Sequence, residues 1–444
     1  MTYATAVEKR FQRVASVAHM DFGRWSATCS ARGIWMIAVD LTRDGPAPGA
    51  GTSGSHRTIA LCGLTMIVEG FDTYAIGYVG PAIAKEWAIS QVQVGLVYSI
   101  GVAASLVGSV VFGGLADRFG RRRLLIGATI LFGIATLLGA VADGVGTLIV
   151  SRLLAGIGLG ASIPCALALA TEAASERHRA SVPVLMSAAI ASGMIFSGLA
   201  AALIMPAYGW RGLMAAGGII PLLLVAPMYW GLIETRQAEG EEEQEKPWRI
   251  LTQRPIATLV AVMTLALFGT YLVAFFMSFW LPSMLTPLTA DIQGVGFGMM
   301  VIKTASLLGS LTVAALMARV QPGRLLPATF LIGAVALALG LRDHGNFTMT
   351  VAVLAFISFF IDGAFSGIIG FGAWIFPSRI RATAIGVTTG MGRFSGGTLG
   401  PMAGGMMLDR GFGLPAIATI AAMPLLMAGL LVAIAAGIHR RGNA

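Results

Sequence analysis

Charged residues are scarce in this chain. Asp, Glu, Lys and Arg together make up 11% of its 444 residues, whereas hydrophobic residues make up 56%. Soluble domains carry about 25% charged residues, so the composition argues against a soluble globular protein. Together with a mean hydropathy of +0.80, it indicates a polytopic membrane protein.

Cysteine and histidine are also rare. The three cysteines, Cys29, Cys62 and Cys165, have no spacing typical of a disulfide framework or a metal site. Two of them fall in predicted helices, where we expect small packing residues. The five histidines have no metal-binding or catalytic-triad spacing either; they lie at 19, 56, 178, 344 and 439. We therefore expect neither an enzyme nor a bound metal or cofactor.

Long apolar runs, in contrast, are abundant, and a membrane helix needs roughly 20 such residues. We predict an all-α membrane protein of twelve transmembrane helices, at 58–81, 91–115, 123–142, 147–173, 181–207, 211–233, 255–285, 291–317, 324–341, 348–375, 381–408 and 412–438. The 58 glycines fit this prediction, because small residues let membrane helices pack closely. The helix at 381–408 carries four of them on one face, at Gly392, Gly396, Gly400 and Gly404.

The chain has a net charge of +9, which can attract nucleic acid, but the distribution of its basic residues indicates membrane topology instead. Of the 30 Lys and Arg, sixteen fall in loops on the side of the two termini and four in loops on the other side. Seven precede residue 58. By the positive-inside rule, both termini are expected in the cytoplasm of a bacterial-type inner membrane. The remaining three, Arg152, Lys303 and Arg393, lie within predicted helices.

The predicted spans form two halves. A polar segment at 234–254 separates a six-helix bundle at 58–233 from another at 255–438, and 439–444 form a cytoplasmic tail. The run Arg-His-Arg-Ala-Ser at 177–181 recurs as Arg-Ile-Arg-Ala-Thr at 379–383, which indicates a parallel internal repeat. Residues 1–57 mix charge with Gly, Pro and Ser and predict a disordered cytoplasmic tail, unless translation starts at Met20 or Met36.

A charged turn, GGLADRFGRRR at 113–123, connects two uncharged runs. It resembles the signature between the second and third helices of the major facilitator superfamily of transporters. The resemblance implies a conformational role for Gly113, Asp117, Arg118, Gly120 and Arg121. Glycines would allow helix approach and a tight reversal, the acid would sit where a helix ends, and the arginines would anchor the turn to anionic lipid. A basic turn that only sets topology is the alternative.

Seven ionisable side chains fall at apparent membrane depth: Glu69, Asp72, Arg152, Glu172, Lys303, Asp362 and Arg393. Insertion of a charged side chain at this depth costs at least ~2.5–3.5 kcal/mol, so each of the seven is expected to have a partner or a function that offsets the cost. Glu69 and Asp72 are three residues apart and share one face of their helix. Two close carboxylates resist double ionisation, so one of them can carry a proton near neutral pH. An arginine keeps its proton and instead attracts an anion or a carboxylate.

The run EGFDTYAIGYVGP at 69–81 resembles the first helix of the aromatic acid:proton symporter family. Further matches are RLLAGIGLG at 152–160 with Pro164 and Glu172, FPSRIRAT at 376–383, GMGR at 390–393 and Gly400-Pro401, so the resemblance covers about 58–440. It implies a major facilitator fold and functional roles for Glu69, Asp72, Arg152, Glu172, Arg381 and Arg393. The chain departs from the family pattern in Glu69 for the usual Asp, in Cys165 after Pro164, and in the additional Asp362.

Each of these residues also has a purely structural interpretation. Glu172 either forms a surface pair with the arginines at 177 and 179 or takes part in gating, and Arg381 is either topological or functional. Lys303 either snorkels to the membrane surface or pairs with Asp362. The aromatic residues of the seventh helix, among them Tyr271, either form core or stack on a substrate ring, and Trp374 is weighed in the same way.

Together these features predict alternating-access uptake of an aromatic carboxylate, such as a hydroxybenzoate, with protons. We expect Glu69 and Asp72 to couple protons and Arg152 and Arg393 to bind the substrate. The expected partners are the aromatic acid, protons and the bilayer; no feature indicates an obligate protein partner. A proton-driven efflux antiporter of the same fold and a non-transporting sensor of aromatic acids remain the alternatives.

Deletion of residues 2–50 is expected to leave uptake nearly unchanged, because this segment has a linker composition and no run of membrane length. Uptake of the aromatic acid, normalised to the amount of protein in the membrane, measures the effect. A loss of uptake at equal abundance would show that the tail takes part in function and would favour the sensor interpretation.

Overall fold

The computed structural model describes residues 52–176, 178–234, 251–254, 256–289, 292–341, 346–377 and 380–442. All of them belong to one compact unit, Pro46–Ala444. The predicted tail up to residue 51, most of the predicted 234–254 linker, and the side chains of Asp117 and Arg118 lie outside this description.

Within the described ranges the chain is helical and contains no strand. The first half consists of α3 (Thr52–Trp87), α4 (Gln91–Phe119), α5 (Arg121–Ala140), α6 (Val145–Ala173) and α7 (Val182–Gly231). The second half consists of α9 (Ile256–Leu285), α10 (Ile292–Met317), α11 (Pro322–Gly340), α12 (Phe347–Ile375), α13 (Arg381–Asp409) and α14 (Leu414–Gly442). This confirms the predicted all-α membrane architecture.

Ten of the helices described are long and apolar enough to cross a membrane. This number is smaller than the twelve predicted spans for two reasons. Helix α7 contains two predicted spans, joined at Gly209, whose φ of 63° breaks the helical geometry. Helix α13 contains the eleventh predicted span, but its many Gly, Thr and Ser residues leave it outside the ten. All twelve predicted spans thus lie on helices.

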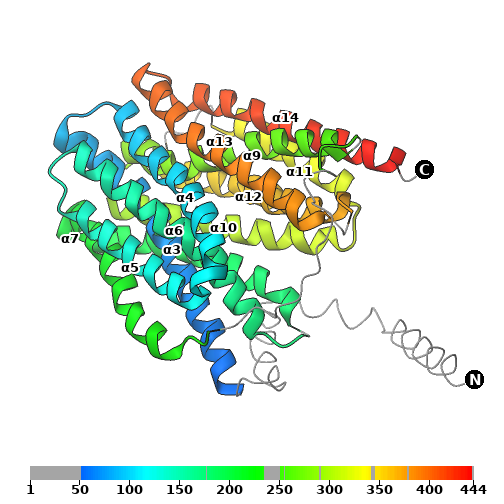
Figure 1. The fold of residues 1–444 in the computed structure, drawn as a ribbon. Helices are drawn as coiled ribbons and strands as arrows, with labels where there is room; N and C mark the ends of the chain where they lie inside the picture. Colours follow the sequence, from blue (N-terminus) through cyan, green and yellow to red (C-terminus); the bar gives the residue numbers. More distant parts are fainter. Residues whose placement is uncertain are drawn as a thin grey trace, which may run out of the picture. The chain divides into compact units, whose positions relative to one another are not determined.

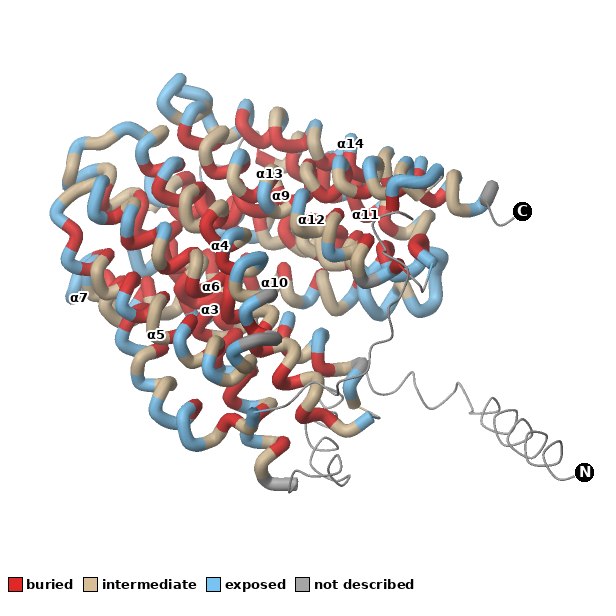
Figure 2. The backbone as a smooth tube through the Cα atoms, viewed as in Figure 1, coloured by how far each residue is buried: buried red, intermediate tan, exposed pale blue. Residues whose placement is uncertain are grey.

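The helices form two bundles, drawn from blue to green and from green through yellow to red in Figure 1. Helices α3 to α7 pack on one another, as do α9 to α14, and the bundles meet where α4 packs on α13, α7 on α10 and α3 on α9. Figure 2 shows buried residues concentrated around α3, α4 and α6, with exposed residues on the outward faces of the helices. The large exposed side chains include Val110, Phe196 and Leu331, as expected for faces that meet lipid.

The two bundles touch most closely at one end. We call the end that carries Arg121, Arg122 and Arg123 the arginine-rich end. At the opposite end, a Cβ on Gly95 of α4 would lie 2.8 Å from the carbonyl oxygen of Pro401 on α13. A Cβ on Gly405 of α13 would clash with the Gln91 carbonyl of α4. Here the two backbones are in contact, and only glycine fits between them.

Toward the arginine-rich end the same two helices diverge. A Cβ placed on Gly113 of α4, or on Gly386 or Gly390 of α13, would meet nothing within 4 Å. Among the described residues, no other helix therefore approaches Gly113 closely in this conformation. The structure thus has its bundles closed at the opposite end and apart at the arginine-rich end.

Within the second bundle, the glycine face of α13 packs on α9 as expected. A Cβ on Gly392 would lie 2.7 Å from the Leu267 side chain, and one on Gly400 would clash with the carbonyl of Leu272. Gly396 and Gly404 are enclosed in the same way. The glycine spacing on α13 therefore sets the distance between these two helices.

Gly400→Ala is expected to destabilise the protein by about 1–3 kcal/mol, because the added methyl group forces α13 away from α9. The matched control is Gly127→Ala on α5, where nothing lies within 4 Å of the new Cβ. Thermal unfolding of the detergent-extracted protein measures the difference. A melting temperature of Gly400→Ala equal to that of Gly127→Ala would contradict the packing argument.

Candidate functional site

The two acids of α3 lie deep inside the protein. Glu69 is 3% exposed and Asp72 is 1% exposed, and both line one cavity, as their spacing predicts. Residues three apart fall on the same side of a helix. Both carboxylates of α3 thus line the same buried cavity.

Asp72 is held by two neighbouring helices of the first bundle. Its Oδ1 accepts a hydrogen bond from Thr136 Oγ1 on α5 at 2.7 Å. Its Oδ2 lies 3.4 Å from Nη1 of Arg152 on α6, which is 5% exposed. Arg152 Nη2 also donates to Thr136 Oγ1 at 3.1 Å. Arg152 therefore has a carboxylate partner inside the first bundle, one of its two expected roles.

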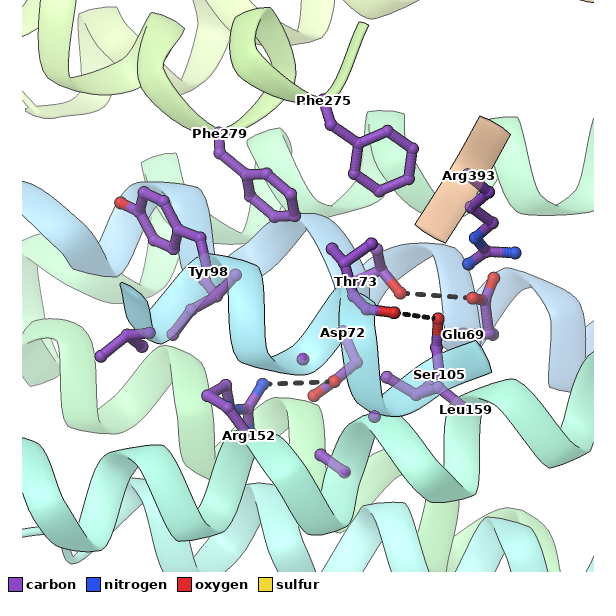
Figure 3. A pocket seen from close by; sticks show the side chains of 16 residues that line it. Glu69, Asp72, Thr73, Tyr98, Ser105, Arg152, Leu159, Phe275, Phe279 and Arg393 are labelled. Carbon is purple, nitrogen blue, oxygen red and sulfur yellow. Dashed lines mark hydrogen bonds and ion pairs between the residues drawn. The ribbon is translucent and has the colours of Figure 1, made fainter. Parts of the chain in front are cut away.

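Glu69 faces the other bundle. Its Oε1 accepts a hydrogen bond from Thr73 Oγ1, one turn further along α3, at 3.2 Å. Figure 3 shows the guanidinium of Arg393 pointing toward this carboxylate, and the two charges interact electrostatically. Since Arg393 lies on α13, this interaction joins the two bundles.

The cavity between these residues has a volume of about 40 Å³, well below the roughly 300–1,000 Å³ typical of small-molecule sites, so a ring-sized ligand requires it to widen. Aromatic rings form one wall. Tyr98 of α4 stacks on Phe279 of α9, with ring centroids 5.1 Å apart and planes at 17°. Phe275 lies 5.8 Å from Phe279. Figure 3 shows this wall facing the acids and arginines.

Two donors in the cavity have no hydrogen-bond partner among the residues that the structure describes. The Nε atoms of Arg152 and Arg393 are both buried without a hydrogen bond, and both residues line the cavity. Buried N–H groups are normally paired, and an unpaired one calls for an explanation such as a missing ligand. Guanidinium groups bind carboxylates with high geometric complementarity. The chemistry of the residues that line the cavity thus suits a flat ring that carries a carboxylate.

Lys303 and Asp362 lie outside this cavity, in the second bundle. Lys303 of α10 is 5% exposed and donates to Ser278 Oγ at 2.9 Å. Its ammonium lies 5.3 Å from the centroid of the Tyr74 ring. Asp362 of α12 accepts from Ser306 Oγ at 2.5 Å and interacts electrostatically with Lys303. Burial of Lys303 is inconsistent with snorkelling to the surface, so that interpretation is wrong.

The aromatic candidates separate into two groups. Phe275 and Phe279 line the cavity. Tyr271 is buried behind them, 5.9 Å from Phe275, and is not among the lining residues. Trp374 is 37% exposed near the end of α12 and stacks on Phe371 at 5.5 Å. Neither Tyr271 nor Trp374 lines the cavity wall.

The residues of the charged turn lie away from the cavity. Gly120 has a φ of 90° between α4 and α5, as expected for a tight reversal. Arg121 forms an ion pair with Glu172 at the end of α6. The Arg122 backbone N–H donates to Oε1 of Glu234, which follows α7, at 3.3 Å. An arginine of the turn is thus one partner of Glu172.

Arg381 begins α13, and its Nε donates to the Phe376 carbonyl at the end of α12 at 3.3 Å. This contact connects two consecutive helices. Like the turn, Arg381 is remote from the cavity, which leaves a conformational role for both as a prediction.

Sequence reasoning missed Tyr98, Thr73 and Thr136. None of them is charged, and a tyrosine or threonine within a membrane helix is too common to mark a site. Thr73 could have been predicted, because it lies one turn from Glu69 on the same helix. The positions of Tyr98 and Thr136 depend on how α4 and α5 pack on α3. Cys62 and Cys165 are both buried in one cluster of the first bundle, as expected for packing residues.

Comparison with known proteins gives a family match over most of the chain. The family model of the Major Facilitator Superfamily matches residues 62–401. The chain is 32% identical over 393 residues to the 3-(3-hydroxy-phenyl)propionate transporter of Escherichia coli K12, covering 87% of this chain and 95% of that protein. It is also 29% identical to the 4-hydroxybenzoate transporter PcaK of Pseudomonas putida, with coverage of 84% and 90%. A gallate transporter of Pseudomonas putida is 28% identical, with coverage of 86% and 92%.

Solved structures share the fold. A bacterial homologue of the human lysosomal transporter Spinster, in an inward-facing occupied conformation, superposes with a TM-score of 0.71 at 17% identity, covering 89% of this chain and 98% of that one. A D-xylose–proton symporter gives a TM-score of 0.65 at 16% identity, covering 85% and 96%. The fold, the family match and the relatives named as aromatic acid transporters lead to one conclusion: this chain belongs to the major facilitator superfamily.

Proposed function

We propose that this transporter takes up an aromatic carboxylate together with protons by alternating access. One observation carries the proposal: a buried cavity combines two unpaired arginine N–H groups, an aromatic wall and two carboxylates. The relatives named as transporters of hydroxylated aromatic acids support this substrate class.

In this proposal, each wall of the cavity binds a different part of the substrate. The carboxylate meets Arg393, which comes from the second bundle, while the ring lies against Tyr98 and Phe279. Offset stacking of aromatic rings contributes about 0.5–1.5 kcal/mol beyond the burial of apolar area. The guanidinium supplies charge-assisted hydrogen bonds. Charge therefore selects the acid, and the wall selects a flat ring.

Coupling to protons follows from competition for Arg393. The substrate carboxylate and Glu69 both require this one cation. When Glu69 takes up a proton, it no longer competes, so substrate and proton favour each other's binding. Asp72 remains with Arg152 and Thr136 inside the first bundle and provides a second carboxylate whose charge depends on its protonation.

We assign the arginine-rich end to the cytoplasm by the positive-inside rule. In this orientation the described conformation is closed toward the outside and open toward the cytoplasm. A rocking motion of the two bundles would then expose the cavity to the other side. Uptake is the direction in which the proton gradient of a bacterial inner membrane drives such a symporter.

Uptake of a panel of labelled aromatic acids, with and without a protonophore, tests the proposed function. We expect accumulation of at least one hydroxylated aromatic acid and its loss with the protonophore. Accumulation that persists with the protonophore would contradict symport, and net transport only outward would favour the efflux alternative.

Asp72→Asn is expected to abolish proton-driven accumulation, because it removes a titratable group but preserves its size. Glu69→Asp should retain much of the activity, and Glu69→Gln should not accumulate substrate, although its binding affinity should no longer depend on pH. Accumulation in proteoliposomes and substrate binding at several pH values measure these effects.

The matched control is Asp143→Asn, the same change at an exposed acid between α5 and α6. If the buried charges served only to hold helices together, the neutral variants would show reduced thermal stability in detergent. A stably folded Asp72→Asn protein that still accumulates substrate against a gradient would contradict the proton role of Asp72.

Arg393→Lys is expected to raise the KM roughly tenfold or more, because lysine retains the charge but loses the planar pair of donors that matches a carboxylate. Initial uptake rates over a range of substrate concentrations measure the change, and Arg324→Lys at an exposed position of α11 is the control. An unchanged KM would remove Arg393 from the substrate site.

A further inference from the structure

The first turn of α4 is completed by a residue of the other bundle. An α-helix begins with N–H groups that have no partner within the helix. In α4, Ser90 Oγ accepts from the Gln93 N–H at 3.3 Å, and Gln93 Oε1 accepts from the Ser90 N–H at 3.1 Å. This reciprocal capping box leaves the N–H groups of Gln91 and Val92 to be satisfied.

Asp409, the last residue of α13, supplies both missing acceptors. Its Oδ1 accepts from the Gln91 N–H at 2.8 Å, and its Oδ2 accepts from the Val92 N–H at 3.0 Å. A carboxylate at a helix N-terminus is also favoured by the helix dipole. The two oxygens of one side chain therefore hold the start of a helix in the opposite bundle.

Further contacts hold α4 and α13 together near Asp409, at the end opposite the arginine-rich end. Ser99 Oγ donates to the Thr398 carbonyl at 2.7 Å. Gly405, one turn before Asp409, leaves no room for a side chain against Gln91. The carboxylate thus lies where the bundles touch, at the end opposite the arginine-rich turn.

The sequence around Asp409 is similar to that of the arginine-rich turn. Residues 404–411 read GGMMLDRG, and residues 113–120 read GGLADRFG. Both runs place an Asp-Arg pair in the last turn, or directly at the end, of a helix that packs across the bundle interface. One pattern lies at each end of the α4 and α13 pair.

We propose that Asp409 is a latch that stabilises the conformation closed at this end and must release the N-terminus of α4 for the bundles to separate there. This inference rests on one part of the proposed function, the alternating access of the two bundles, and not on the identity of the substrate or ion. Separation leaves the Gln91 and Val92 N–H groups to bond with water in place of the carboxylate, and it removes the carboxylate from the helix dipole. Asp409 is thus a residue that sets the balance between the two states without contact to substrate.

Spin labels on Lys85→Cys at the end of α3 and Ala416→Cys at the start of α14 report the separation of the bundles at the latch end. Both positions are exposed, and the native cysteines are replaced by alanine. The distance distribution is measured in nanodiscs without substrate. Its outcome is therefore independent of which acid or ion is transported, and a failure of the proposed function would appear only in the uptake assay.

Asp409→Ala is expected to increase the population with separated labels roughly fivefold, the factor that corresponds to about 1 kcal/mol for loss of an N-cap side chain. Asp409→Asn keeps an acceptor oxygen but loses the charge, so it should give a smaller increase. If Asp409→Ala does not fold, the Asn variant carries the test.

Asp143→Ala, an exposed acid at the same end of the first bundle, is the control and should leave the distribution unchanged. A wild-type distribution in both Asp409 variants would overturn the latch. An equal shift in Asp143→Ala would also overturn it, because the loss of any negative charge at this end would then be sufficient.

Discussion

Burial of charge in an apolar bundle organises the centre of this protein. An ion without a partner costs several kcal/mol in such surroundings, so each acid and each arginine must meet an opposite charge or a hydrogen-bonding group. Asp72 meets both Thr136 and Arg152, and thereby fixes how α3 packs against α5 and α6. The buried Nε atoms of Arg152 and of Arg393, which have no hydrogen-bond partner among the described residues, are the groups to which the proposed function assigns the anion.

The two acids of α3 differ in how they respond to motion of the bundles. The partners of Asp72 all belong to the first bundle, so a rigid-body movement leaves this network intact. Glu69 interacts with Arg393 on α13, and the same movement changes that interaction. Helix α3 thus carries Asp72, which stays with its partners when the bundles move, and Glu69, whose partner Arg393 belongs to the other bundle. In the proposed symport, this difference would couple protonation to conformation.

Glycine determines which contacts are permanent and which are not. Along α13, four glycines pack on α9 within one bundle, and this close packing makes the bundle a rigid unit. Between the bundles, close contacts among the described glycines include those of Gly95 and Gly405, near Asp409, and that of Gly198 on α7 with Gly296 on α10. The same glycine-rich helix therefore serves as a fixed wall on one face and as a separable contact on the other.

Sequence by itself determined the membrane class, the helical spans, the tight turn at Gly120 and the pairing of Glu69 and Asp72 on one face. These features depend on composition and on spacing along a single helix. It did not reveal the partners that lie on other helices, such as Thr136 for Asp72, Tyr98 for the aromatic wall, or Asp409 for the start of α4. Only the tertiary structure decided these, because they depend on the rotation and separation of packed helices, which local spacing does not encode.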